Sequence, residues 1–340
     1  MPEVAVANRP PAADTTQQSR FARVVHWDGA GLFVAFAVLF VILSFTAKNF
    51  LTVDNMFFLV QQAAFFGIVA LAMTLVIVAG EIDVSVGSHA ALSSAMLGVL
   101  VVEIGLPMWL ACVVVICSSI LIGAFAGWIR AAFDVPSFIV TLALFLALRG
   151  IALMLTRATP IPLPANEFFY WGTGRIAGMP ASALYMAVYL IIVFVVIAFI
   201  ARRTVFGRSI YAVGGNAHAA ELSGVRVKRV RILVFVISGL SAGVIGILLS
   251  AQLSSGTSSI GLGLEFDAIA AVIIGGTLLS GGKGTVSGTL LGAFFIALLT
   301  NGMVLMGVDQ YAQQVVRGAL VLAAVLISAV RQRRSVERAV

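Results

Sequence analysis

Two carboxylates lie in a short glycine- and serine-rich segment that interrupts the apolar sequence. Glu81 and Asp83 belong to residues 80–88, which read GEIDVSVGS. The Asp83 carboxylate could cap a following helix by accepting backbone N–H groups, bind the hydroxyls of a polar solute, or couple a transport step to a proton or sodium ion. Ser85 and Gly87 are compatible with each role, because small residues let a broken helix approach a neighbour or a ligand closely.

Further charged residues lie inside long apolar runs, where an ionised group is costly and needs a partner or a function. Arg149 and Arg317 each precede a glycine, and Glu265 and Asp267 open another apolar run. Salt bridges, or side chains that extend to the membrane interface, are one explanation. Hydrogen bonding to a polyhydroxylated solute is the other. The candidate pathway residues are Glu81, Asp83, Ser85, Gly87, Arg149, Asn301 and Arg317, with the amides Gln61, Gln62 and Gln252 as further candidates.

The residue types that enzymes use do not form a recognisable constellation. A phosphate-binding loop ending at Lys283 would need glycine at position 277 and serine or threonine at 284, but the chain has Thr277 and Gly284. The histidines and cysteines show neither metal-ligand spacing nor a nucleophile–base pattern: His26, His89, His218, Cys112 and Cys117. The sequence therefore predicts no catalytic residue, no metal site and no cofactor bound by this chain.

The composition is that of a membrane protein. Of 340 residues, 61% are hydrophobic and 10% are charged, and the mean hydropathy is +1.10, whereas soluble domains carry about 25% charged residues. The apolar residues come in runs of roughly 17 to 24, a length of helix that crosses about 30 Å of hydrocarbon. Strand-like alternation of the barrel kind is absent, so helices must satisfy the backbone. We expect an all-α polytopic membrane protein with about ten transmembrane helices, near residues 30–47, 56–79, 86–103, 107–129, 137–156, 183–201, 232–252, 265–280, 286–306 and 311–330.

The net charge of +7 is explained by membrane orientation rather than by a nucleic-acid partner, because the basic residues lie between the apolar runs. With the N-terminus in the cytoplasm, 16 of the 21 lysines and arginines fall on the inner side: nine in the tails and short connections, and seven in residues 202–231. Both termini are therefore expected to be cytoplasmic, with lipid around the spans.

The chain divides into one membrane domain and two tails. Residues 1–29 are polar and rich in alanine and proline, which predicts a flexible cytoplasmic tail without a signal peptide. Residues 30–330 form a single predicted transmembrane domain, and residues 331–340 a basic cytoplasmic tail. Residues 157–182 are the predicted outer loop, and their aromatic run at 168–171 suits an anchor at the membrane interface.

The only long connection predicted on the inner side is residues 202–231. Residues 214–216 (GGN) predict a turn with Asn216 as a helix N-cap, residues 217–223 form a short helix, and Gly224 suits its C-terminal cap. The small alanines of this helix would let a partner groove approach closely, as in helix-in-groove recognition. A simple turn before the next span is the alternative.

Three glycine-rich stretches together resemble one known family. Residues 207–225 read GRSIYAVGGNAHAAELSGV, residues 80–88 read GEIDVSVGS, and residues 274–289 read IGGTLLSGGKGTVSGT. Their order and spacing, with the ten-span plan over about residues 30–330, resemble the ribose-type monosaccharide permeases of ATP-binding-cassette (ABC) importers. Glu81 stands where that pattern leads us to expect glycine, which leaves the subclass of substrate open.

The resemblance implies a set of partners and a docking element. It implies a permease subunit in the bacterial cytoplasmic (inner) membrane that carries a monosaccharide or related polyol, with ATP and Mg²⁺ bound by a separate cytoplasmic ATPase. It also implies an extracytoplasmic sugar-binding protein and a second permease copy, identical or a sibling. The short helix of the inner loop would transmit closure of the ATPase through the coupling residues Gly215, Asn216, Ala219, Ala220, Leu222, Ser223 and Gly224.

Three other functions compete with this interpretation. A secondary transporter coupled to ions through Glu81 and Asp83 would work without a partner chain. An ABC permease for branched-chain amino acids would need paired ionic sites for the fixed charges of its substrate. A membrane-embedded enzyme would need a catalytic constellation that the sequence does not show.

Overall fold

The computed structural model describes residues 30–164, 175–176 and 179–337. Within these residues the chain forms twelve α-helices, one π-helical turn and four two-residue strands, which confirms the expected all-helical class. Seven helical segments are long and apolar enough to cross a membrane. They are α3 (Val53–Val78), α4 (Val86–Gly98) with the π-turn η1 (Val99–Glu103), α5 (Met108–Phe133), α6 (Ser137–Thr156), α8 (Ala181–Arg203), α11 (Val227–Leu253) and α13 (Val286–Leu305).

Three further helices correspond to the remaining predicted spans. They are α2 (Ala30–Thr46), with 17 residues, α12 (Leu264–Ile274), with 11, and α14 (Gln310–Glu337), with 28. α12 ends well before the predicted residue 280, because Gly276 takes a left-handed conformation with φ +94° directly after it. Eleven helical residues reach only about 17 Å, so α12 is too short to span a bilayer alone. α14 continues past residue 330, where the basic tail was predicted to begin.

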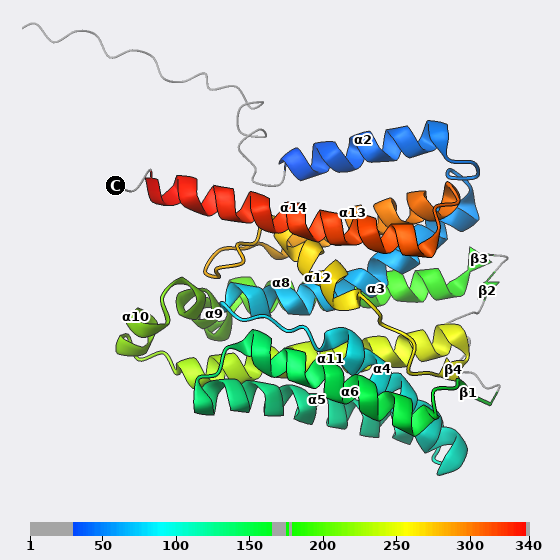
Figure 1. Cartoon of the computed structure of the whole chain (residues 1–340), viewed down its shortest axis with the longest axis horizontal. Coiled ribbons are helices and arrows are strands. Elements are labelled where there is room, and N and C mark those ends of the chain that lie inside the picture. The colour runs from blue at the N-terminus through cyan, green and yellow to red at the C-terminus, as the bar shows by residue number, and fades with distance from the viewer. Residues whose placement is uncertain (1–29, 165–174, 177–178, 338–340) are drawn as a thin grey trace, which may run out of the picture.

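Most helices run along the long axis of the molecule in one bundle (Figure 1). One end carries α9 (Val205–Gly215) and α10 (Ala217–Leu222). The other end carries two strand pairs, β1 (Ile161–Pro162) with β4 (Ser255–Gly256) and β2 (Arg175–Ile176) with β3 (Met179–Pro180). The segments predicted as inner and outer loops therefore lie at opposite ends of the bundle. The predicted tail 1–29 and the aromatic run 168–171 lie outside the described residues.

Two passes of the chain through the bundle are only partly helical (Figure 1). Residues 79–85 leave the end of α3 and lead back to α4 as mostly buried, non-helical chain. Residues 254–263 connect α11 to α12 in a similar way (Figure 1). Non-helical backbone is tolerated at membrane depth only where protein surrounds it or water reaches it. Each of these two segments therefore needs specific partners for its backbone groups.

α3 is the central helix of the bundle. Every residue of α3 from 63 to 78 is buried, and the helix packs against α8, α11, α12 and α13.

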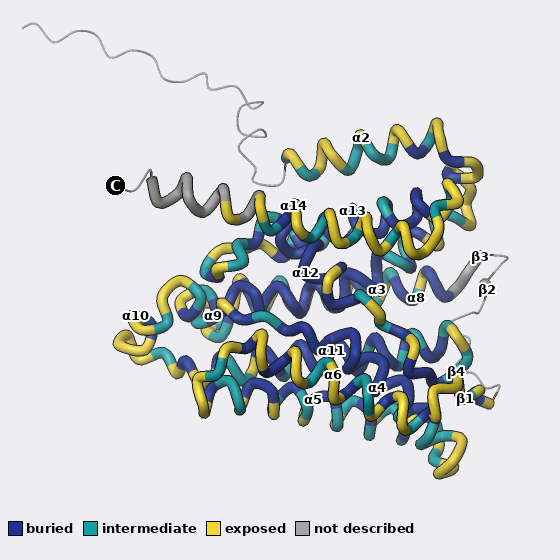
Figure 2. The backbone as a smooth tube through the Cα atoms, viewed as in Figure 1, coloured by how far each residue is buried: buried dark blue, intermediate teal, exposed yellow. Residues whose placement is uncertain are grey.

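The outer surface of the bundle is apolar. Figure 2 shows the buried interior in dark blue inside a largely exposed periphery. Leu121, Met154 and Phe199 on the outer helices are 68%, 79% and 61% exposed. Large outward-facing apolar side chains on many helices require an apolar environment, which agrees with the predicted lipid contact.

Candidate functional site

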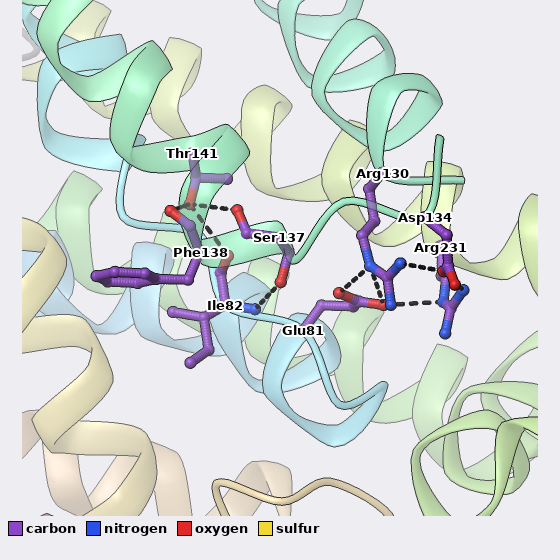
Figure 3. Close-up of polar contacts among 8 residues, drawn as sticks. All are labelled: Glu81, Ile82, Arg130, Asp134, Ser137, Phe138, Thr141 and Arg231. Carbon is purple, nitrogen blue, oxygen red and sulfur yellow. Dashed lines mark hydrogen bonds and ion pairs between the residues drawn. The ribbon is translucent and has the colours of Figure 1, made fainter. Parts of the chain in front are cut away.

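The unwound segment 79–85 obtains its hydrogen bonds from hydroxyl groups on α6. The backbone N–H of Ile82 donates to Ser137 Oγ at 3.1 Å, and that of Val84 donates to Thr141 Oγ1 at 3.1 Å. The Thr141 hydroxyl lies 3.2 Å from the Ile82 carbonyl, to which it can donate (Figure 3). An unsatisfied buried backbone group would cost about 1–3 kcal/mol, so these two hydroxyls make an extended chain possible at this depth.

Glu81 is the centre of a buried ion-pair network. Its carboxylate lies 2.8 Å from Arg130 Nε at the end of α5 and 2.8 Å from Arg231 Nε in the first turn of α11. The Arg130 contact is a hydrogen bond, whereas the Arg231 Nε contact is an ion pair without hydrogen-bond geometry. Both arginines also reach Asp134, at 2.5 and 3.4 Å (Figure 3). The network ties segment 79–85 to α5 and α11.

Asp134 is the solvent-facing member of this network. Its side chain is 83% exposed and lies in the short connection between α5 and α6. The hydrogen bond from Arg130, with the charges of Arg130 and Arg231, holds the pKa of the Asp134 carboxyl below its usual value. Asp134 therefore stays ionised and offsets part of the positive charge of the two arginines.

Asp83 is buried and fully hydrogen-bonded within the protein. Its Oδ1 accepts the backbone N–H of Ser85 at 2.9 Å and the Ser85 hydroxyl at 2.6 Å. Its Oδ2 accepts the hydroxyl of Ser238 on α11 at 2.6 Å. Ser85 is the N-cap residue of α4 and makes no side-chain cap bond itself. Of the three roles considered for Asp83, these contacts support the organisation of the helix start.

The two partly helical passes meet at Gly87 in the first turn of α4. A Cβ atom added to Gly87 would lie 2.1 Å from Glu265 Oε2 and 2.2 Å from the Gly261 carbonyl. The first turn of α4 thus touches the turn that precedes α12, at a distance that only glycine permits. The Glu265 carboxylate lies against the N-terminal end of α4, where the helix dipole is positive.

Three glycine-containing segments meet at the opposite end of segment 79–85, near the end of α9. The backbone N–H of Gly282 donates to the Val78 carbonyl at 2.9 Å. A Cβ on Gly214 would lie 1.7 Å from that same carbonyl and 2.6 Å from Gly282 N, and a Cβ on Gly281 would lie 2.9 Å from Gly80 Cα. We call these five residues the glycine junction. It joins the end of α3, the end of α9 and the turn between α12 and α13, all through backbone contacts.

α10 projects from the end of the bundle and is capped as the sequence predicts. Asn216 Oδ1 accepts the backbone N–H of Ala219 at 2.9 Å, and Gly224 has φ +83°. The sequence did not predict α9, which begins after its N-cap residue Thr204. Gly215 is the last residue of this helix and not part of the predicted turn. The exposed residues of the predicted coupling set are Gly215, Asn216, Ala219, Leu222, Ser223 and Gly224.

Within α10, one predicted contact residue is covered and one protrudes. Ala220 is only 5% exposed, so its side chain packs inside this chain and is not free for a partner groove. Leu222 is 77% exposed. A single large apolar side chain at the tip of an exposed helix can act as the anchor that fills a partner pocket.

Two neighbouring pockets lie among α3, α11, α12 and α14. The larger has a volume of about 910 Å³ and the smaller about 230 Å³. Both are lined by Gln62, Leu262, Asp267 and Arg317. Arg317 Nη1 lies 3.3 Å from Asp267 Oδ2, so the expected salt bridge forms for this pair. Arg317 lines these pockets, and so do the further pathway candidates Gln61, Gln62 and Gln252.

Arg149 and Asn301 hold neighbouring segments together. Arg149 Nη1 donates to the carbonyls of Ser258 and Ile260 at 2.6 and 2.8 Å, and so fixes segment 254–263. Asn301 and Asn55 exchange two amide hydrogen bonds, at 2.8 and 3.2 Å, between α13 and α3. Both side chains satisfy buried polar groups, and neither lines the two pockets.

Comparison with known proteins gives a consistent result. A family model described as "Branched-chain amino acid transport system / permease component" matches residues 55–325. The chain is 48% identical over 310 residues to the "Probable ABC transporter permease protein YphD" of Escherichia coli K12, covering 91% of this chain and 92% of that protein. The chain belongs to the ABC-transporter permease family.

Two relatives of this permease carry substrate names. The "Ribose import permease protein RbsC" of Escherichia coli K12 is 40% identical over 304 residues, which is 88% of this chain and 93% of that protein. The "Xylose transport system permease protein XylH" of the same strain is 36% identical over 365 residues, or 89% and 93%. No solved structure matches. Family membership confirms a multi-pass protein of the bacterial cytoplasmic membrane, which is a transport subunit and not itself an enzyme or a cofactor-binding chain.

The permease brings together only part of the residue set expected from sequence. Glu81, Asp83, Ser85 and Gly87 do lie along one segment, while Arg149, Asn301 and Arg317 lie elsewhere. Sequence reasoning missed the hydroxyls of Ser137 and Thr141. Their signal was present, since they are one helical turn apart at the start of an apolar helix and so share a face.

Proposed function

We propose that this chain is the membrane-spanning permease subunit of an ABC importer that moves a monosaccharide or related polyol across the cytoplasmic membrane. The observation that carries the proposal is similarity over almost the whole chain to permeases named for ribose and xylose. The family description names branched-chain amino acids. The pocket lining argues for a sugar instead, because Arg317, the cation that lines both pockets, already pairs with Asp267 and is not free for the carboxylate of an amino acid.

The proposed topology has ten crossings with both tails in the cytoplasm. Seven of the crossings are the full-length helical segments. The other three are α2, α14, and α12 together with the unwound residues 254–263. The opposite placement of α10 and of the strand pairs supports this topology (Figure 1), as does the concentration of basic residues in 202–231.

The proposed partners act at the two ends of the bundle. A cytoplasmic ATPase, which binds ATP and Mg²⁺, docks on the exposed residues of α10, and an extracytoplasmic sugar-binding protein meets the end that carries β1 to β4 (Figure 1). A second permease copy, identical or a sibling, completes the membrane unit.

Reconstitution tests the proposed function. The permease is purified gently from native membranes with its associated chains, placed in proteoliposomes, and assayed for vanadate-sensitive ATP hydrolysis and sugar uptake. We expect an ATPase and a binding protein to co-purify, and the loaded binding protein to stimulate hydrolysis. Uptake by this chain alone under a proton or sodium gradient would establish the ion-coupled alternative instead.

Changing Leu222 to aspartate is expected to weaken ATPase docking. Burial of a leucine side chain contributes about 1.5–3 kcal/mol, so its loss should weaken association by roughly tenfold or more. Association is measured by titrating the ATPase onto the permease in nanodiscs. Leu222→Met keeps the apolar volume and is the matched control. Equal affinity of Leu222→Asp and the wild type would show that the ATPase does not use this tip.

A further inference from the structure

The glutamines of the membrane domain converge on one place. Between residues 30 and 330 the chain has six glutamines. All six line the two pockets: Gln61, Gln62, Gln252, Gln310, Gln313 and Gln314. They come from α3, α11 and α14, so neither local sequence nor one helix face explains the clustering.

The lining has the chemistry that recognises uncharged hydroxyl groups. A glutamine amide offers two donors and an acceptor without a charge. The smaller pocket adds the rings of Phe58, Phe65 and Phe66, which can cover the apolar C–H face of a sugar ring. Pockets of this type, mostly apolar with a few convergent polar groups, are the usual form of a small-molecule site.

One of these amides lacks a partner. Gln62 Oε1 is buried and accepts no hydrogen bond from any described residue, and the same is true of Arg317 Nε as a donor. Both side chains line both pockets. A buried carbonyl oxygen without a donor is costly, and a hydroxyl of a passing solute would satisfy it.

One ion pair borders both pockets. Asp267, which is 3% exposed, pairs with Arg317. Glu265 also lines the larger pocket, where its Oε2 is buried and accepts no hydrogen bond from the described residues. An anionic solute would find no unpaired cation among the lining residues and would lose its hydration, which is unfavourable in a low dielectric. The lining therefore favours a neutral solute over sugar phosphates and sugar acids.

We propose that the two pockets form one transit site for an uncharged monosaccharide, in which Gln62 binds sugar hydroxyls and the Asp267–Arg317 pair leaves no free cation to hold an anionic solute. This inference rests on the proposed function. It adds the place inside the membrane domain where the sugar is bound and the chemical class of solute that is transported.

The test uses the complete importer, with ATPase and binding protein, in proteoliposomes. A panel of radiolabelled neutral pentoses and hexoses first identifies a sugar that the wild-type importer takes up. For that sugar, Gln62→Leu should lower uptake roughly tenfold, as expected for a lost hydrogen bond to a buried group. ATP hydrolysis stimulated by the loaded binding protein should stay within about twofold of wild type, because docking at the two ends is untouched. Gln62→Asn should recover part of the uptake.

Two controls separate a site from a general defect. Thr46→Val on α2 removes an exposed hydroxyl that bonds only to its own helix, and uptake should stay unchanged. Asp267→Asn should lower uptake because Arg317 loses its partner, and the double variant Asp267→Asn/Arg317→Gln should restore it because no unpaired guanidinium remains in the site. Wild-type uptake in Gln62→Leu, or no recovery in the double variant, would overturn the inference while leaving the importer function intact. Absence of uptake of any sugar by the wild type would instead overturn the proposed function itself.

Discussion

Replacing Gly214 with alanine is expected to uncouple ATP hydrolysis from transport in this permease. The added Cβ would lie 1.7 Å from the Val78 carbonyl and 2.6 Å from Gly282 N. Both are backbone atoms and cannot rotate away, so α9 must move off the glycine junction. Overpacking of this kind costs about 1–3 kcal/mol, and each 1.4 kcal/mol is a factor of ten in an equilibrium. We expect the sugar moved per ATP hydrolysed to fall by roughly tenfold.

The reason lies in what the junction connects. α9 leads directly into α10, the proposed docking helix, and the junction ties α9 to the start of segment 79–85. At its other end that segment continues into α4, whose Gly87 touches Glu265 beside the larger pocket. A movement of α10 therefore reaches the pocket wall through packed backbone and, at the last contact, through the Glu265 side chain. We infer that this contiguous chain of contacts couples the two ends.

A second variant covers the case in which Gly214→Ala does not assemble. The hydroxyl of Tyr211 on α9 donates to the Gly284 carbonyl at 3.0 Å, so Tyr211→Phe removes one bond across the junction and keeps the ring. A smaller fall in sugar moved per ATP is expected. Gly31→Ala, where nothing lies within 4 Å, and Ser209→Ala, whose hydroxyl bonds only within α9, are the matched controls. Full coupling in both junction variants would show that α9 does not transmit the motion.

The features that sequence predicted well are those set by local chemistry. Apolar runs gave seven segments of spanning length, since hydropathy reports directly on transfer into lipid. The Asn216 cap was readable because the acceptor and the N–H that it satisfies are three residues apart. The three glycine stretches that carried the family resemblance are also the three that meet at the junction, although their spatial convergence could not be seen from the sequence.

The features that sequence could not predict depend on backbone path and on distant partners. α12 was predicted as a full span because the mean hydropathy of the segment does not reveal the glycine whose left-handed conformation ends the helix. Ala220 looked like a contact residue because its small size suits close packing, and the packing turned out to be internal. For Arg149 the sequence left open a salt bridge, extension to the membrane interface and a bond to the solute, and the side chain instead binds two carbonyls of segment 254–263. Each of these outcomes is decided by tertiary structure.

Neutralising Glu81 is expected to destabilise the permease more than neutralising an exposed carboxylate. Glu81→Gln leaves Arg130 and Arg231, only 13% and 17% exposed, with Asp134 as their remaining counter-ion. Removing one partner of a buried ion pair costs about 3–5 kcal/mol. The exposed Asp134 carboxylate still offsets part of the charge, so we expect about 2–3 kcal/mol. Glu103→Gln, at an exposed position of η1, is the control and should change little.

Thermal unfolding in detergent, with a double-variant cycle, tests whether this loss belongs to the network. If Glu81 acts through Arg231, Arg231→Gln should cost less in the Glu81→Gln background than in the wild type, because the carboxylate that Arg231 pairs with is already absent there. The same cycle separates the two roles considered for Glu81. If Glu81 couples transport to an ion, Glu81→Gln should lose gradient-driven uptake and keep its stability. If Glu81 instead holds segment 79–85 to α5 and α11, the variant should lose stability first, and transport should fall only as the bundle loosens. Additive costs in the cycle would contradict the network role, and they would return Glu81 to the ion-coupling hypothesis.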